Sequence, residues 1–335
     1  MFSQFVRADN VYMSMISGYS LYVDSGESSE TISHNHAIHV TQINSEEECY
    51  LVKLNIAHHS FCLNDWIDVI LKPANKSFFW PIDIVIKNDD YYLVFLRKFI
   101  PEIKSICDFS IEENFLGLEQ KHIKKLTSNF LLACNSLYKH SFLFHIWNER
   151  RIYVNKKDYS LLIAFSDFTS KGFDKKEHLN NNEYMSENID PYAFTGECLY
   201  DYYSEMYSIA SILFKLLIGR YPYEGSLMDG IPKCSDSGCI NSWDIDKDND
   251  FKYWVNQYVS HPIFIFDNCD DRNAIGRLAH EKICLQRWDS LTERVKNMFC
   301  SVFSEGNVLR TNNNLISYSP MEWFEEIQKF EFKLK

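Results

Sequence analysis

The sequence predicts an α+β fold in which a β-rich part comes first and a mainly helical part follows. Short alternating segments of apolar and polar residues, broken by polar turns, dominate residues 1–100, and this period of two is typical of strands. In residues 101–335, apolar residues recur at helical intervals. The 335 residues are 46% hydrophobic and 16% aromatic, which supports a large buried core. We expect two lobes of one domain, with a hinge near Arg97–Ser105.

The first part contains several strand candidates and one helix. VYMSMI, SLYVDS and AIHVTQI alternate, and CYLVKLNI (49–56) is a further strand candidate. LNDWIDVIL (63–71) has helical spacing, with Asn64 as its expected N-cap and Pro73 just beyond its end. FFWPIDIVIKNDDYYLVFLRKF (78–99) predicts a hairpin that turns at Asn-Asp-Asp.

The second part is predicted to be built around helices. LEQKHIKKLTSNFLLACNSLYKH (118–140) is amphipathic, and SEMYSIASILFKLLIG (204–219) is nearly all apolar, so it predicts a buried central helix that stops at Gly219. Two further amphipathic helices are expected over Trp288–Phe303 and Ser319–Phe330. Between the first two helices, FHIWNERRIYVNKKDYSLLIAFSDF (144–168) reads as a loop, a strand, a turn and a second strand.

Charge and cysteine usage exclude several classes of function. The net charge of −12 argues against sequence-independent binding of nucleic acid or of an acidic membrane, since both need a basic face. Ten cysteines lack regular spacing, and MFSQFVRADN does not resemble a secretory leader. No apolar run reaches about 18 residues, so no membrane span is expected. These features predict a cytoplasmic protein with reduced thiols.

The order of the segments resembles that of a protein kinase domain over roughly residues 45–330. It is most similar to bacterial kinase-like proteins encoded beside von Willebrand A domains and PPM-type phosphatases. The resemblance is carried by SEMYSIASILFKLLIGRYPYEG, followed by HPIFIFDNCDDRN, RWDSLTERVKNMFCSVFSEG and SPMEWFEEI, and by FFWPIDIV before the hinge. It implies a bilobal kinase-like fold, with a β-rich N-lobe (1–100) and a mainly helical C-lobe (101–335).

The resemblance also implies where ATP would bind. Protein kinases cover the phosphates with a glycine-rich loop and pair a strand lysine with a helix glutamate. Upstream of Lys53 the only nearby glycines are Gly18 and Gly26, among several acidic residues, so no phosphate cradle is expected. Lys53 resembles the strand lysine, and Asp65 or Asp68 stands where the glutamate is expected. The alternative is that Lys53 is a salt-bridged edge residue.

The positions that would carry the reaction are degenerate. Gap-free counting places Ile146 on the catalytic aspartate, Arg151 on the metal-binding asparagine and Ala164 on the metal-binding aspartate. Isoleucine cannot accept a proton, and a guanidinium repels Mg²⁺. His145 is adjacent and is either a base or a structural histidine. A shift of three residues reaches Asp167, which is either a metal ligand or a loop carboxylate.

Two acidic positions keep a structural role in the resemblance. Glu187 echoes the glutamate that ends the activation segment, where it pairs with an arginine of the C-lobe. Glu205 stands near the start of the central helix, where the family's carboxylate accepts backbone N–H bonds from the catalytic loop. The scaffold position therefore keeps its charge while the reactive positions have lost theirs.

These observations predict a catalytically inactive protein-kinase fold, a pseudokinase, that acts as a binding, scaffolding or regulatory subunit. The partners would be proteins, and the resemblance implies von Willebrand A and PPM-phosphatase proteins among them; no cofactor is expected. The first alternative is a divergent ATP-dependent Ser/Thr kinase, or another phosphate or nucleotidyl transferase. It would use Lys53 and Asp167, with ATP bound with or without Mg²⁺ and with Asp158 or Asp174 as a relocated base. The second alternative is a structural subunit whose cleft is filled by its own aromatic side chains.

Overall fold

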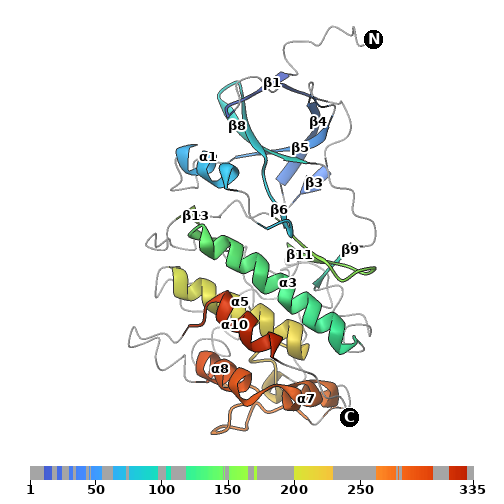
Figure 1. The fold of residues 1–335 in the computed structure, drawn as a ribbon, viewed down its shortest axis with the longest axis vertical. Coiled ribbons are helices and arrows are strands. Elements are labelled where there is room, and N and C mark those ends of the chain that lie inside the picture. The colour runs from blue at the N-terminus through green and yellow to red at the C-terminus, as the bar shows by residue number, and fades with distance from the viewer. Residues whose placement is uncertain are drawn as a thin grey trace, which may run out of the picture.

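The computed structural model has a mixed α+β fold, which confirms the predicted class. It describes residues 11–16, 21–24, 30–32, 35–42, 45, 47–54, 63–72, 75–96, 103–106, 118–145, 147, 151–164, 170–171, 200–228, 262–276, 278, 281–304 and 317–329. The large sheet and one helix lie together, and the remaining helices lie below them (Figure 1). Of the predicted hinge near Arg97–Ser105, residues 97–102 lie outside the described residues, and Ile103–Ser105 form a strand, β9.

The large sheet has seven strands in the order β2-β1-β7-β8-β5-β4-β3. An additional pairing of β2 with β4 closes all of them except β3 into a barrel. The strands are β1 (Val11–Ser14), β2 (Leu21–Asp24), β3 (Glu30–Ile32), β4 (Asn35–Gln42), β5 (Glu48–Lys53), β7 (Asp83–Lys87) and β8 (Asp90–Leu96). The turn between β7 and β8 has Asn88 and Asp89 at φ of 51° and 65°, which suits the predicted Asn-Asp hairpin.

Strand alternation gives this sheet two different apolar faces. The barrel interior is made by Tyr12, Tyr22, Val40, Cys49, Leu51, Val85 and Val94. The opposite face carries Val52, Leu54, Ile84, Leu93 and Phe95, in one cluster with Trp66, Val69 and Ile70 of helix α1 (Leu63–Leu71). Helix α1 has the predicted bounds, but it begins at Leu63, so Asn64 lies inside its first turn and is not the N-cap.

The helical part is arranged around α5 (Tyr202–Ile218), whose residues 204–218 are all buried. The Asp201 side chain caps its N-terminus by accepting from the Tyr203 and Ser204 N–H groups. Gly219 ends the helix at φ 95°, as the sequence predicts. Around it lie α3 (Gln120–Lys139), α7 (Glu281–Ser290), α8 (Glu293–Phe303) and α10 (Pro320–Gln328), with the short 3₁₀ turn η5 (Ser226–Met228). Among the described residues, none of these helices has the length and apolar character needed to cross a membrane.

The prediction of one helix over Trp288–Phe303 is wrong. Two helices share this stretch, because Thr292 accepts a hydrogen bond from the Val295 N–H and so caps the start of α8. In α10, Ser319 and Glu322 form a reciprocal capping box ahead of the helix, with Pro320 in its first turn. Local capping residues therefore set both helix starts.

Two small sheets accompany the large one, and the first of them joins the sheet part to the helical part. The first has the order β6-β12-β11-β9, formed by β6 (Phe78–Phe79), β12 (Leu161–Ala164), β11 (Ile152–Asn155) and β9 (Ile103–Ser105). The second pairs β10 (Phe142–Leu143) with β13 (Ser170–Lys171). Strand β6 runs parallel to β12, so a segment between α1 and β7 is hydrogen-bonded to the hairpin of the second part.

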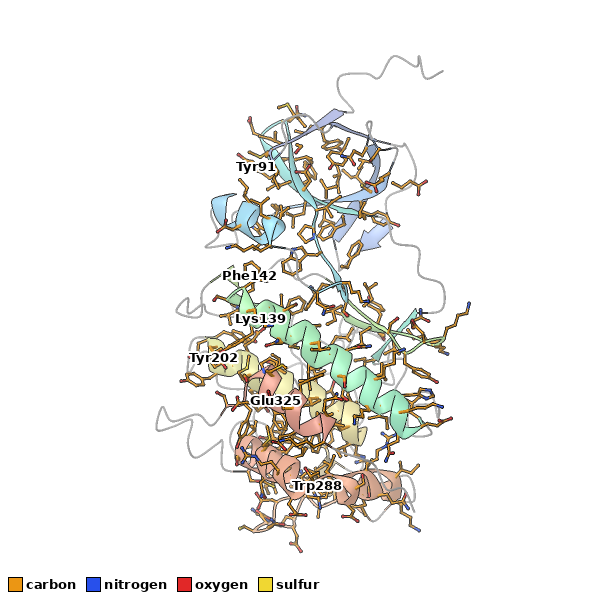
Figure 2. The ribbon with its side chains drawn as sticks, in the orientation of Figure 1. Tyr91, Lys139, Phe142, Tyr202, Trp288 and Glu325 are labelled. Carbon is orange, nitrogen blue, oxygen red and sulfur yellow. The ribbon has the colours of Figure 1, made fainter. Side chains whose placement is uncertain are left out.

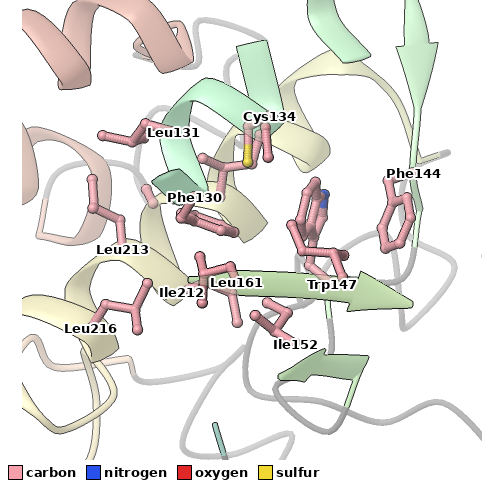
Figure 3. Close-up of a cluster of buried hydrophobic side chains, with 14 of the residues drawn as sticks. Phe130, Leu131, Cys134, Phe144, Trp147, Ile152, Leu161, Ile212, Leu213 and Leu216 are labelled. Atoms are coloured by element: carbon pink, nitrogen blue, oxygen red, sulfur yellow. The ribbon is translucent and has the colours of Figure 1, made fainter. Parts of the chain in front are cut away.

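One continuous hydrophobic core runs through both parts of the molecule. It extends from Val52 and Trp66 in the sheet part to Trp323 and Ile327 in α10. Figure 3 shows its centre, where side chains of α3, α5 and the β11–β12 hairpin meet Phe144 and Trp147.

Candidate functional site

The candidate site is the loop at residues 142–147, which lies against the start of α5. Glu205, in the first turns of α5, receives four hydrogen bonds at its carboxylate. The Phe144 N–H donates over 2.8 Å and the His145 N–H over 3.2 Å. The Trp147 indole N–H donates over 2.8 Å and the Tyr200 hydroxyl over 2.7 Å. One side chain therefore fixes the backbone and an aromatic ring of this loop.

Glu205 is only 2% exposed, so its charge is taken out of water. Burial raises the pKa of its carboxyl, and the hydrogen bonds from Tyr200, Phe144, Trp147 and His145 offset part of this rise. A position near the N-terminus of a helix also favours negative charge. The sequence pointed to Glu205, but it did not reveal Trp147 and Tyr200 as its partners. Their only signal is that each aromatic residue carries a donor close to the loop or to the helix start.

His145 is a buried part of this loop. Its backbone lies in the left-handed region at φ 66°, and its side chain is 1% exposed. The imidazole stacks on the Tyr200 ring with the ring centroids 4.9 Å apart. Glu205 of the central helix α5 accepts a hydrogen bond from the His145 N–H, and this bond helps to hold the left-handed backbone conformation of His145.

The hairpin beside the loop brings two of the degenerate positions together. Ile152 of β11 faces Ile163 of β12, so the next pair outward is Arg151 and Ala164. Both are buried, Arg151 being 7% exposed and Ala164 8%. The fold thus gathers the two positions that the resemblance assigns to metal binding, but they carry a guanidinium and a methyl group. Neither group can ligate a cation.

Three predicted site residues lie outside the described residues: Ile146, Asp167 and Glu187. Asp174, the second candidate for a relocated base, also lies outside them. Within the described ranges, no group of three or more His, Cys, Asp or Glu side chains is placed to hold a metal ion.

Asp158, the other candidate base, lies in the exposed turn between β11 and β12. This turn is at the opposite end of the hairpin from Arg151 and Ala164. Its carboxylate accepts hydrogen bonds from the Ser160 N–H and hydroxyl, which lower the pKa of Asp158. The Lys125 ammonium donates to the backbone carbonyl oxygen of Asp158. Asp158 therefore stabilises the β11–β12 turn and does not lie at the candidate site.

Lys53 lies on the barrel side of the sheet. It faces Tyr92 across β5 and β8, and its ammonium contacts the Asp90 carboxylate over 2.6 Å. The hydrogen bond to Asp90 raises the pKa of Lys53. Helix α1 packs on the opposite face, beside Val52 and Leu54, so the strand directs Lys53 away from the helix that carries Asp65 and Asp68. The side chain of Asp65 is outside the described part of the structure.

Aromatic side chains fill the region between β6 and the loop. Phe78 lies 5.7 Å from Phe144 between ring centroids, and Trp80 lies 5.9 Å from Phe142. Phe142 is found where the sheet part meets the helices (Figure 2). These contacts join the two parts through apolar surface rather than through charged groups.

The described part of the site can therefore hold a loop in place, but it offers little for group transfer. Its carboxylate, Glu205, is already bound by four donors, and the paired positions Arg151 and Ala164 supply no oxygen ligand. No protein-family model matches this chain, and no curated protein matches it either.

Proposed function

We propose that this chain has a bilobal protein-kinase-like fold without catalytic activity and that it acts as a binding, scaffolding or regulatory subunit. One observation carries the proposal. Glu205 holds the loop at residues 142–147, while the positions that the resemblance assigns to metal ligands carry Arg151 and Ala164, which adjoin the Ile152–Ile163 pair of the hairpin. A structural feature of the family's site is thus paired with side chains that cannot perform its chemistry.

Electrostatics supports an inactive site. A triphosphate with Mg²⁺ needs backbone amides, a lysine and carboxylates to offset its charge. Here Arg151 is buried and carries a cationic guanidinium, which cannot ligate Mg²⁺. Lys53 is engaged with Asp90 on the face of the sheet that is turned away from α1. Asp167 lies outside the described residues, so none of these contacts bears on its role as a metal ligand. The rival proposal of a divergent kinase rests on this residue.

Protein surfaces are the partners that fit this proposal. The net charge of −12 disfavours nucleic acid. The resemblance of the sequence suggests von Willebrand A and PPM-phosphatase proteins as partners, and we place the chain in the cytoplasm with them.

A thermal-shift experiment separates the inactive protein from the divergent kinase. Addition of Mg·ATP should leave the Tm unchanged, whereas binding at one hundred times the Kd would stabilise the folded state by about 2.7 kcal/mol. A clear rise in Tm that Lys53→Ala or Asp167→Ala abolishes would favour the kinase. Asp158→Ala is the matched control, because Asp158 lies at the far end of the hairpin. Transfer of labelled phosphate to a generic protein substrate would refute the proposal directly.

A structural subunit with a filled cleft is the second candidate. The ring contacts of Phe78 with Phe144 and of Trp80 with Phe142 favour it, because they occupy space between the two parts. Size-exclusion chromatography of the chain co-expressed with its genomic neighbours tests this function. A stable stoichiometric complex that ATP does not alter supports a structural subunit, and a chain that elutes alone argues against it.

A further inference from the structure

Strands β1 and β2 are neighbouring strands that together close the barrel. We call this pair the strap, defined as Val11–Ser14 with Leu21–Asp24. The two strands pair with each other, β1 also pairs with β7, and β2 also pairs with β4. Without the strap, β4, β5, β8 and β7 would form an open antiparallel sheet.

The strap is attached by short ladders. Its register with β7 is Met13 to Ile86 and Ser14 to Val85, extended by one hydrogen bond from the Met15 N–H to the Ile84 carbonyl. Its register with β4 covers residues 22–24 against 40–42. The ladders between β4, β5, β8 and β7 each cover five residue pairs. Release of the strap as a unit breaks both of its ladders, two residue pairs to β7 and three to β4, whereas release of β8 together with β5 would break two ladders of five pairs each.

One buried carboxylate ties the strap to the sheet. Asp83, at the start of β7, is 6% exposed. Its Oδ1 accepts from the Ser14 hydroxyl over 2.9 Å and from the Ile84 N–H over 2.8 Å, and its Oδ2 accepts from the Tyr22 hydroxyl over 3.0 Å. Ser14 comes from β1 and Tyr22 from β2, so a single side chain on β7 binds both strands of the strap. Charge-assisted bonds of this kind are stronger than neutral ones.

We propose that the strap opens as a unit while the rest of the chain stays folded, with Asp83 as its anchor. Opening would uncover the apolar barrel interior, would free the edge of β7 that pairs with β1, and would free residues 40–42 of β4, while β3 would stay paired with residues 35–37 of β4. The strap is thus a cover over the barrel interior that Cys49 and Leu51 line. This inference does not rest on the proposed function, because it concerns the barrel and not the candidate site.

Two buried cysteines make the opening measurable. Cys49 lies in the barrel interior beneath the strap, and Cys134 lies in the core on α3, each 1% exposed. Labelling with N-ethylmaleimide, followed by peptide mass mapping, reports each thiol separately. Burial, together with the charges of Glu47 and Asp83, raises the pKa of Cys49 to about 11, so the closed barrel contains little reactive thiolate.

In the unmodified chain, Cys49 should react at least tenfold faster than Cys134. Low concentrations of urea should hardly change the Cys49 rate, because local opening exposes little surface, and should raise the Cys134 rate steeply. Equal rates for the two thiols, with the same urea dependence, would overturn the proposal, since the barrel would then open only when the whole chain unfolds. This comparison requires no variant.

Variants test the anchor. Tyr22→Phe and Ser14→Ala each remove one donor to Asp83 and should raise the Cys49 rate roughly tenfold while leaving the Cys134 rate unchanged. Tyr91→Phe is the matched control, because this half-buried tyrosine packs on the other face of the same sheet. An equal acceleration of both thiols, or no acceleration of Cys49, would show that Asp83 does not anchor a separable strap.

Discussion

Truncation of Glu205 should destabilise the whole chain more than any other single carboxylate described above. Glu205→Ala leaves the Phe144 and His145 N–H groups, the Trp147 indole and the Tyr200 hydroxyl without their acceptor. Each buried donor left unpaired costs about 1–3 kcal/mol. The sum is about 4 kcal/mol at the lower limit, which is a large part of the stability of a typical domain, about 5–15 kcal/mol.

More conservative substitutions should produce a graded series. Glu205→Gln keeps one oxygen acceptor but turns an amide N–H₂ toward two of the donors, so the loss should be about 1–3 kcal/mol. Tyr200→Phe removes one donor and leaves the carboxylate with three, so the loss should be about 1–1.5 kcal/mol. Glu325→Ala, at an exposed position on α10 that Figure 2 labels, should lie within about 0.5 kcal/mol of the unmodified chain.

Urea unfolding followed by tryptophan fluorescence and far-ultraviolet circular dichroism measures this series by linear extrapolation. The reasoning is refuted if Glu205→Ala lies within 1 kcal/mol of the unmodified chain at an unchanged m-value, where 1 kcal/mol is roughly the net value of one hydrogen bond. A larger loss for Tyr200→Phe than for Glu205→Ala would also contradict it, because the carboxylate is the group that the four donors share.

Further predictions concern pH, loop packing and Lys53. Burial raises the Glu205 pKa above 4.5, so folding favours its protonated form and the unmodified chain loses stability as pH rises through this raised pKa. The difference in the free energy of unfolding between the unmodified chain and Glu205→Gln should therefore become smaller as pH rises above about 4.5, as measured by urea titrations. A difference that grows with pH would contradict this expectation. Gly225→Ala would place a Cβ 1.7 Å from the Asn273 carbonyl oxygen and should cost about 2 kcal/mol or more in thermal unfolding. Asn273→Ala removes hydrogen bonds to two backbone carbonyls and one N–H and should cost about 3 kcal/mol, so a neutral result would refute the buried network. Lys53→Ala should change stability by less than about 0.5 kcal/mol, because its pair with Asp90 is exposed.

Local patterns predicted the elements whose signals lie within one segment. The nearly all-apolar run at 204–219 predicted a buried helix, and α5 is buried along nearly its whole length. The Asn-Asp turn predicted the β7–β8 hairpin, since two successive left-handed residues require such side chains. The α7–α8 break was missed because Thr292 resembles any polar residue of a helix until its cap bond is seen.

Features that depend on pairing between residues far apart in the chain could not be predicted from the sequence. The closure of the barrel pairs β2 with β4 across residues that no local pattern connects. The face on which Lys53 lies was ambiguous, because β5 is apolar on both sides and its alternation does not say which side receives α1. The four donors to Glu205 come from positions 61, 60, 58 and 5 residues away, and only the fold brings the three distant ones to the carboxylate.

The ring contacts between β6 and the loop at residues 142–147 bear on how the two parts of the molecule can move. A swivel of the sheet against the helices that carried β6 with it would separate Phe78 from Phe144 and Trp80 from Phe142, at about 0.5–1.5 kcal/mol for each ring pair beyond the apolar area exposed. The described ring contacts therefore favour movement of β6 and the loop at residues 142–147 as one rigid body.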